Sequence, residues 1–281
     1  RSYERLVHWW QSNSKKQAKK NIFYHYDLGN EFYSKWLDDT MTYSSALFNS
    51  SSESLEKAQE NKYKNICKNI NPKPEDHILE IGCGWGGFME YAIKHHNVKV
   101  TGLTISKAQH DFTKKRLFEA GLSERAKVLL TDYRNQKGQF DGIASIEMFE
   151  AVGEKYWPVY FNSLKNLMKN GAKSTLQIIT ISDELFPEYR KRVDFIQKYI
   201  FPGGMLPSKK ALEKQFLQVG LKSINLKSFG SSYSKTLRLW HSSFNSVWDD
   251  IASVKFDDRF KRMWNFYLAS CAAVFYSKTG D

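Results

Sequence analysis

A glycine-rich turn directly after an apolar, strand-like segment constrains this chain more than any other feature. The segment His77–Ile81 is followed by four glycines within six residues and then by a helix-like pattern; these are Gly82, Gly84, Gly86 and Gly87. Glycine lets the backbone take positive φ angles and lets a bulky ligand approach the main chain. The turn therefore predicts a ligand site between a strand and a helix.

The spacing of the glycines separates this turn from the dinucleotide-binding pattern. It reads G-x-G-x-G-G, whereas dinucleotide sites read G-x-G-x-x-G. An acid, Glu80, precedes the first glycine by two residues, a placement that is more typical of S-adenosylmethionine sites. The turn alone is a weak signal, and its neighbours decide between these ligands.

Strand-like and helix-like patterns alternate from residue 77 onward. The expected strands are His77–Cys83, Lys99–Ser106, Ala126–Tyr133, Phe140–Glu147 and Ser174–Ile181. The expected helices between them are Gly86–His96, Lys107–Ala120 and Lys155–Lys169. This alternation predicts an α/β, Rossmann-like fold with a mostly parallel, doubly wound sheet, whose ligands lie outside the carboxyl ends of the strands.

The rest of the chain predicts two additions to this sheet. Residues 1–60 lack strand-like runs and predict an N-terminal helical cap, while residues 61–281 form the main domain with a helical insertion over about residues 182–220. Asp183–Gln197 is helix-like and Leu221–Ser228 is strand-like. Two aromatic-rich helices are expected to follow, from about Tyr233 and about Asp257.

The composition favours a folded protein that binds phosphates or an anionic surface. Hydrophobic residues make up 41% of the chain, and the formal net charge is +12. Near the N-terminus, lysines alternate with aromatic residues, a mixture that suits a lipid interface; they are Lys15, Lys16, Lys19 and Lys20 with Trp9, Trp10, Phe23, Tyr24 and Tyr26. A charged surface helix beside ordinary core aromatics is an equally weighted alternative.

The cysteines and the hydropathy indicate a cytoplasmic protein. The three cysteines are widely spaced and include no C-x-x-C pair, so neither a disulfide framework nor a metal site is expected. No apolar run reaches the roughly 20 residues that a membrane span needs, and no secretory signal is visible.

Polar residues at the ends of the second and third strands are candidate ligand contacts. Thr104, Ser106 and Gln109 follow the second strand, where a dinucleotide enzyme would carry an acid, and all three can hydrogen-bond a ribose or an amino-acid group. The segment 131–134 ends the third strand, where an adenine would lie. Ordinary strand-end caps are the alternative interpretation.

Two acids, Glu147 and Glu150, end the fourth strand in a stretch that is otherwise apolar. A carboxylate in such a place is costly unless it is paired or hydrogen-bonded. Carboxylates in clefts are candidates for positioning or for proton transfer. A helix-capping acid is the alternative.

Six motifs in order resemble one family of enzymes. They are Tyr24-His-Tyr-Asp-Leu-Gly-Asn30, Met41-Thr-Tyr-Ser-Ser-Ala46, Gly82-Cys-Gly-Trp-Gly-Gly87, Gly102-Leu-Thr-Ile-Ser106, Met148-Phe-Glu150 and Tyr199-Ile-Phe-Pro202. Together they resemble the cyclopropane-fatty-acyl-phospholipid synthase family, which includes the mycolic acid cyclopropane synthases, from about residue 24 to about residue 276. The resemblance implies a class I methyltransferase fold, with S-adenosylmethionine as methyl donor and the double bond of a lipid acyl chain as acceptor.

The resemblance also implies a set of cofactor contacts. Tyr43 and Ser44 would reach the cofactor from the N-terminal cap. The other contacts would come from the glycine-rich turn and from the ends of the strands: Glu80, Gly82, Cys83, Gly84, Gly86, Thr104, Ile105, Ser106, Gln109, Tyr133 and Arg134.

The base in this family is implied to be a bound bicarbonate. Carried over by position, it would be held by Glu150, by Tyr233 and by the backbone amide of Ile181. Two further ligands differ from the family pattern: a cysteine is Ser45 here, and the histidine position is assigned to Ile179. Gln177, on the same face of the strand as Ile179, is a replacement donor. Cys271 matches a family cysteine once proposed as catalytic, and a structural role is preferred for it.

The implied partners are unsaturated phospholipid acyl chains at the inner, anionic face of the membrane, with the acyl chain bound by the insertion at about 182–220. No nucleic acid is expected as a partner, and a homodimer is left open. The departures at Ser45 and Ile179 leave a cyclopropane, a methylene and a methyl-branched product as alternatives. Two rival readings are an amine N-methyltransferase and a non-enzymatic binding module for RNA or membranes.

Overall fold

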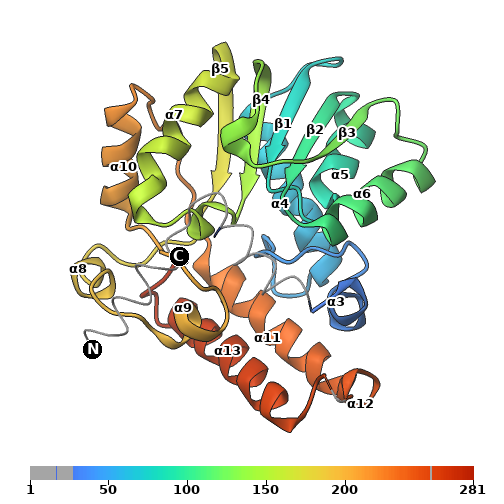
Figure 1. The fold of residues 1–281 in the computed structure, drawn as a ribbon, viewed down its shortest axis with the longest axis vertical. Helices are drawn as coiled ribbons and strands as arrows, with labels where there is room; N and C mark the ends of the chain where they lie inside the picture. The colour runs from blue at the N-terminus through green and yellow to red at the C-terminus, as the bar shows by residue number, and fades with distance from the viewer. Residues whose placement is uncertain (1–16, 18–27, 254) are drawn as a thin grey trace.

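The computed structural model describes Gln17 and residues 28–253 and 255–281. Its centre is one sheet with the strand order β3-β2-β1-β4-β5, in which all four neighbouring pairs are parallel (Figure 1). The strands are β1 (His77–Ile81), β2 (Lys99–Thr104), β3 (Ala126–Leu130), β4 (Phe140–Ile146) and β5 (Met168–Gln177). The predicted parallel, doubly wound α/β fold is confirmed.

Helices cover both faces of this sheet. Successive strand residues point to opposite faces, so Ile78 packs into one hydrophobic core and Leu79 into another. The first core is closed by α4 (Leu55–Ile70), α5 (Gly87–His96) and α6 (Lys107–Glu119), and the second by α7 (Trp157–Leu167) and α10 (Lys209–Gln218).

The strand order fixes where a ligand can bind. From β1 the chain runs outward to β2 and β3, and then returns to the other side of β1 to form β4 and β5. Loops that leave β1 and β4 therefore diverge at the carboxyl ends of these two strands. Open α/β sheets bind ligands in the crevice at such a switch point.

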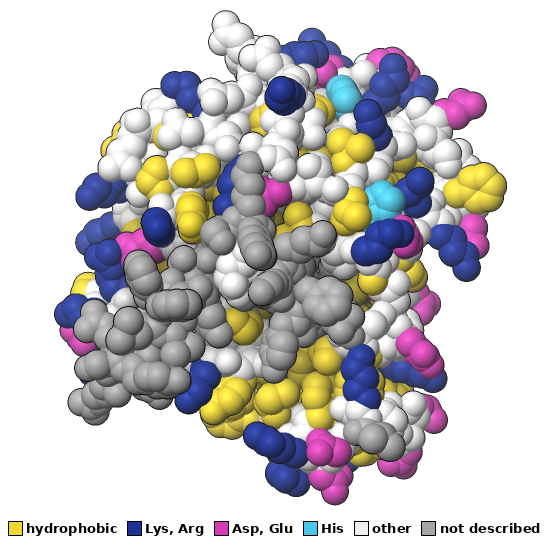
Figure 2. Space-filling model, viewed as in Figure 1, with side chains coloured by type: hydrophobic (Ala, Val, Ile, Leu, Met, Phe, Trp, Pro, Cys, Tyr) yellow, Lys and Arg dark blue, Asp and Glu magenta, His cyan; other side chains and the backbone are white. Residues whose placement is uncertain are grey.

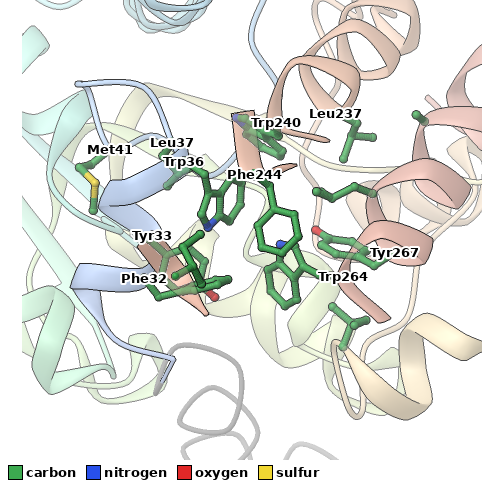
Figure 3. Packing of buried hydrophobic residues seen from close by; sticks show 14 of the residues in the cluster. Phe32, Tyr33, Trp36, Leu37, Met41, Leu237, Trp240, Phe244, Trp264 and Tyr267 are labelled. Carbon is green, nitrogen blue, oxygen red and sulfur yellow. The ribbon is translucent and has the colours of Figure 1, made fainter. Parts of the chain in front are cut away.

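A helical layer lies below these carboxyl ends. The short helix α3 (Asn30–Trp36) packs against the antiparallel pair α11 (Gly230–Ser246) and α13 (Asp258–Tyr276), which α12 (Trp248–Ile251) connects (Figure 1). Aromatic rings from α3, α11 and α13 pack face to edge at the centre of this layer (Figure 3), with ring centroids of Trp36 and Trp240 6.0 Å apart. The two predicted aromatic helices are thereby confirmed.

The insertion is helical as expected, but two predictions between β5 and α11 were wrong. The expected helix Asp183–Gln197 is two short helices, α8 (Phe186–Tyr189) and α9 (Phe195–Tyr199), because Asp194 starts a new helix by capping it at Gln197. Leu221–Ser228 belongs to no strand; Ile224 and Leu226 in it are exposed. Helix α10 was not foreseen within the insertion.

The division at residue 60 stays a prediction, and α4 runs across it without a break. The lysines and aromatic residues near the N-terminus lie outside the described residues. Within the described part of the chain, no helix is both long and apolar enough to cross a membrane.

Candidate active site

A cavity of about 390 Å³ lies at the carboxyl ends of β1, β2 and β4. Its upper wall is the glycine-rich turn with the ends of these strands. Its lower wall is apolar and comes from the insertion and from α11 and α13, with Ile196, Phe201, Leu237, Tyr267 and Phe275. One continuous cavity thus joins a polar, glycine-lined half to a hydrophobic half.

The glycine-rich turn takes backbone angles that other residues rarely adopt. Gly82 has a φ of 83° and Gly86 a φ of 84°, and Gly86 is the N-cap of α5. A Cβ at Gly82 would lie 2.8 Å from Cγ of Met148, and one at Gly86 would lie 2.6 Å from Cγ2 of Thr113. Both positions therefore need glycine, whether or not a ligand is bound.

Glu80 brings a buried acid to the wall of the cavity. Burial raises the pKa of its carboxyl to about 8, and the nearby Lys62 opposes this rise. Its Oε2 atom is buried and has no hydrogen-bond partner among the described residues. A buried polar atom is normally satisfied, and this one can pair with a hydroxyl or amino group of a ligand.

The ends of β2 and β3 supply further polar groups. Thr104 donates its hydroxyl to Oε1 of Gln109 at 2.9 Å, and both side chains line the cavity together with Ile105. Tyr133 and Arg134 also line it, and Asp132 holds the Arg134 guanidinium with a 2.6 Å ion pair. Ser106 instead accepts the amide of Gln109 as the N-cap of α6 and lies outside the cavity lining.

Lys62, a buried lysine that sequence analysis did not identify as part of the site, contacts Ser44. Nζ of Lys62, on α4, donates to Oγ of Ser44 at 2.6 Å. Burial lowers the pKa of Lys62 to about 7, while the carboxylates of Glu147, Asp38 and Glu80 oppose this shift. Nearby, Oη of Tyr43 lies 2.8 Å from Oη of Tyr267, which joins the segment before α4 to α13. In the sequence, nothing distinguishes Lys62 from the other lysines of the same amphipathic helix.

Three hydrogen bonds converge on the carboxylate of Glu147, at the end of β4. Its Oε1 accepts the backbone N–H of Ser45 at 2.7 Å and Nε2 of Gln177 at 2.7 Å. Its Oε2 accepts the hydroxyl of Tyr233 at 2.7 Å. Glu147 lines the cavity, so this carboxylate is fixed at the junction of its polar and apolar halves.

Glu150 lies one turn further on in a different environment. Its Oε1 accepts the backbone N–H of Ile179 at 2.5 Å, and its Oε2 is buried with no hydrogen-bond partner among the described residues. Burial and the nearby charge of Glu147 raise the pKa of Glu150 to about 8. Glu147 is therefore the acid that ionises first, and Glu150 stays protonated near neutral pH.

Comparison with known proteins identifies this architecture. The sequence profile of the mycolic acid cyclopropane synthetase family matches residues 13–281. The chain belongs to this family. It is 38% identical, over 93% of its length and 67% of the relative's, to the cyclopropane-fatty-acyl-phospholipid synthase of Escherichia coli. It is 37% identical to the tuberculostearic acid methyltransferase UfaA1 of Mycobacterium tuberculosis, over 95% of its own length but only 64% of that relative.

Solved structures of the cyclopropane synthetase family share the whole arrangement. The cyclopropane synthase MmaA2 of Mycobacterium tuberculosis superposes with a TM-score of 0.87 at 28% identity, covering 94% of this chain and 95% of MmaA2. The mycolic acid cyclopropane synthase CmaA1, in a structure complexed with SAH and CTAB, superposes with a TM-score of 0.85 at 28% identity and the same coverage.

The geometry corrects part of the site expected from the family resemblance. Ile181 donates its N–H to the carbonyl of Pro207, so the amide beside Glu150 comes from Ile179, two residues earlier. The hydroxyl of Tyr233, which was expected to hold a bicarbonate together with Glu150, donates to Glu147. The fifth strand also differs from its expected bounds: β5 ends at Gln177, four residues before Ile181, and begins at Met168, six residues before Ser174.

The structure also shows the surroundings of three other expected site residues: Ser45, Gln177 and Cys271. Ser45 is buried. Its backbone N–H donates to the carboxylate of Glu147, and its hydroxyl donates to the carbonyl of Ala46. Gln177 bridges Glu147 and the carbonyl of Ser45. Cys271 lines the cavity, and burial raises the pKa of its thiol to about 12. A thiol with this pKa is a poor nucleophile at neutral pH, which favours a structural role.

Proposed function

We propose that this chain is an S-adenosylmethionine-dependent C-methyltransferase that acts on the double bond of an unsaturated fatty acyl chain in a membrane phospholipid. The observation that supports this most is the single cavity in which the glycine-rich, polar half continues into an aromatic, apolar half. Membership of the mycolic acid cyclopropane synthetase family supports the same reaction class.

The polar half fits S-adenosylmethionine. Glu80 offers a carboxyl oxygen that has no hydrogen-bond partner among the described residues, and the cavity is lined by Gly82, Gly84 and Gly87 of the turn, with open space where a side chain at Gly84 would lie. Thr104 and Gln109 offer further hydrogen-bonding groups, and Tyr133 offers an aromatic face. When bound, the sulfonium supplies an activated methyl group.

The apolar half fits an acyl chain. Burial of each methylene contributes roughly 0.8 kcal/mol, so the wall formed by Ile196, Phe201 and Leu237 favours a hydrocarbon over a small polar amine. The rings of Tyr233 and Phe275 stack at 4.4 Å beside Glu147. An aromatic face stabilises a cation by about 0.5–2 kcal/mol, which suits the positive charge that methylation of an alkene leaves on the chain.

The surface near the apolar half supports access from a membrane. Phe266 on α13 and Tyr199 on α9 are exposed by 54% and 42%. Figure 2 shows hydrophobic side chains gathered in the lower part of the view, with both basic and acidic side chains around them. The net charge of the whole chain, +12, favours binding to the anionic inner face of the membrane. Cytoplasmic location, peripheral membrane binding and a homodimer stay predictions.

Transfer of label from [methyl-³H]S-adenosylmethionine to phospholipid vesicles tests this function. Vesicles of dioleoylphosphatidylglycerol should acquire label in the acyl chain, and vesicles of the saturated distearoyl lipid should not. Label in a small amine instead of lipid would favour an N-methyltransferase. No transfer to either acceptor would favour a binding module.

A further inference from the structure

The carboxylate of Glu147 accepts hydrogen bonds from Tyr233 and Gln177, two of the residues that the family resemblance places around a bicarbonate. The resemblance implies a bicarbonate held by Glu150, by Tyr233 and by the backbone amide of Ile181, with Ser45 and Ile179 at two altered ligand positions and Gln177 as a replacement donor. In the structure, Tyr233, Gln177 and the amide of Ser45 all donate to Glu147, each at 2.7 Å. The amide of Ile179 is taken by Glu150.

The backbone of Glu147 is in a strained conformation. Its φ is 91°, in a region that non-glycine residues rarely adopt. Such strain persists only where the surroundings over-determine the conformation, as they do at active sites. Here the three hydrogen bonds to the side chain and the bond from its own N–H to the carbonyl of Gln177 supply that constraint.

A separate bicarbonate does not fit these residues. Tyr233 has one hydroxyl proton, and it already points to Oε2 of Glu147. A second anion would also lie against an ionised carboxylate, and like charges in a site of low dielectric repel strongly. The described residues thus provide a built-in carboxylate where the family resemblance predicts a bound one.

We propose that Glu147 is the catalytic base of this enzyme, acting in place of bicarbonate; the inference rests on the proposed methylation of an acyl double bond. The alkene π pair forms the new C–C bond as the sulfonium C–S bond breaks, which leaves a cation on the neighbouring acyl carbon. Oε2 of Glu147 then takes a proton from the new methyl group. The released C–H pair closes a cyclopropane ring, or forms a methylene double bond if a hydride shift has first moved the cation.

The arrangement leaves Glu147 one lone pair for this proton. A carboxylate has about four acceptor positions; Ser45 and Gln177 use two at Oε1, and Tyr233 uses one at Oε2. The charge of Lys62 and the hydrogen bonds oppose the rise that burial causes in the pKa of Glu147. Glu150, which is protonated near neutral pH, adds no second negative charge.

The test compares wild type, Glu147→Gln and Glu147→Gly in buffer stripped of carbon dioxide, with label transfer to dioleoylphosphatidylglycerol as readout. Wild type should keep its rate when bicarbonate is removed. Glu147→Gln should lose at least about 100-fold, as expected for a missing general base. Glu147→Gly relieves the backbone strain and frees the donors, so added bicarbonate or formate should restore its activity by at least about tenfold.

Controls separate a lost base from a lost fold. Glu119→Gln, at an exposed carboxylate on α6, should behave as wild type. Binding of S-adenosylmethionine and thermal unfolding are measured for every variant, and anion rescue of Glu147→Gly is a response that a purely structural role would not give. A wild-type rate that depends on bicarbonate, or a Glu147→Gln variant as active as wild type, would overturn the inference. A wild type that methylates no lipid would overturn the proposed function itself.

Discussion

At the scale of single residues, the site separates two glutamates by their surroundings. Among the described residues, Glu147 receives three hydrogen bonds, whereas Glu150 receives one and has one oxygen without a partner. Because burial favours the neutral acid and hydrogen bonds favour the ion, Glu147 ionises more readily than Glu150. Two acids three positions apart in the sequence thus take different roles.

The raised pKa of Glu150 predicts how stability depends on pH. In the unfolded chain the carboxyl ionises near its usual pKa of 4.5, whereas in the folded chain it ionises near 8. The folded state therefore binds the extra proton between these values, and the free energy of unfolding falls as pH rises through this window. Glu150→Gln can keep the hydrogen bond from Ile179 and should remove this dependence.

Urea unfolding from pH 5 to pH 9 measures this effect. The stability of Glu150→Gln relative to wild type should rise with pH by at most a few kcal/mol, since one pKa unit corresponds to about 1.4 kcal/mol. Glu147, Tyr160 and Tyr189 also interact with Glu150 but are unchanged in the variant. A stability difference that is the same at every pH would contradict the assignment of the proton to Glu150.

Sequence reasoning at this scale found the residue types but not all of the partners. It placed Glu80, Tyr43, Ser44 and the glycine-rich turn, all of which line or flank one cavity. It named Glu147 as a candidate for positioning or proton transfer but did not find its partners, because hydrogen bonds from the Ser45 amide and the Tyr233 hydroxyl, more than 80 positions away, leave no local pattern. Lys62 was missed because no local pattern marks its buried contact with Ser44.

At the scale of elements, the caps decide where helices begin. Ser106 and Asp194 each accept the amide of the third helical residue, and so begin α6 and α9. The strong alternation of residues 77–181 predicted the strands and helices of the sheet to within a few residues at most ends. The same alternation did not predict the helices after β5. There α8, α9 and α10 are short; α10 packs against α7, and Phe195 of α9 packs against Phe266 of α13.

The cap at Ser106 gives a prediction for α6. Ser106→Ala should lower the free energy of unfolding by about 1 kcal/mol, whereas Ser106→Asp should keep it, because aspartate also caps a helix and favours its N-terminus. Urea unfolding of both variants measures this difference. Unchanged stability together with weaker S-adenosylmethionine binding in both variants would show instead that the hydroxyl serves the cofactor.

At the scale of the whole molecule, the site lies between two layers with separate cores. The sheet and its helices provide the glycine-rich turn and both glutamates, while the aromatic layer of α3, α11 and α13 provides Tyr233 and the apolar wall (Figure 3). The family resemblance predicted cofactor contacts from the sheet and a contribution of Tyr233 to the site. The contact between the layers, through Tyr233 and Glu147, became visible only in three dimensions.

In the proposed reaction, a methyl group joins a lipid double bond and then loses a proton to Glu147. Mass spectrometry of dioleoylphosphatidylglycerol after reaction with S-adenosylmethionine that carries a trideuteriomethyl group tests this sequence of steps directly. We expect a lipid that gains one carbon and keeps two of the three deuterons, and we expect Glu147→Gln not to form this product. A lipid without deuterium, or one that keeps all three deuterons, would contradict it.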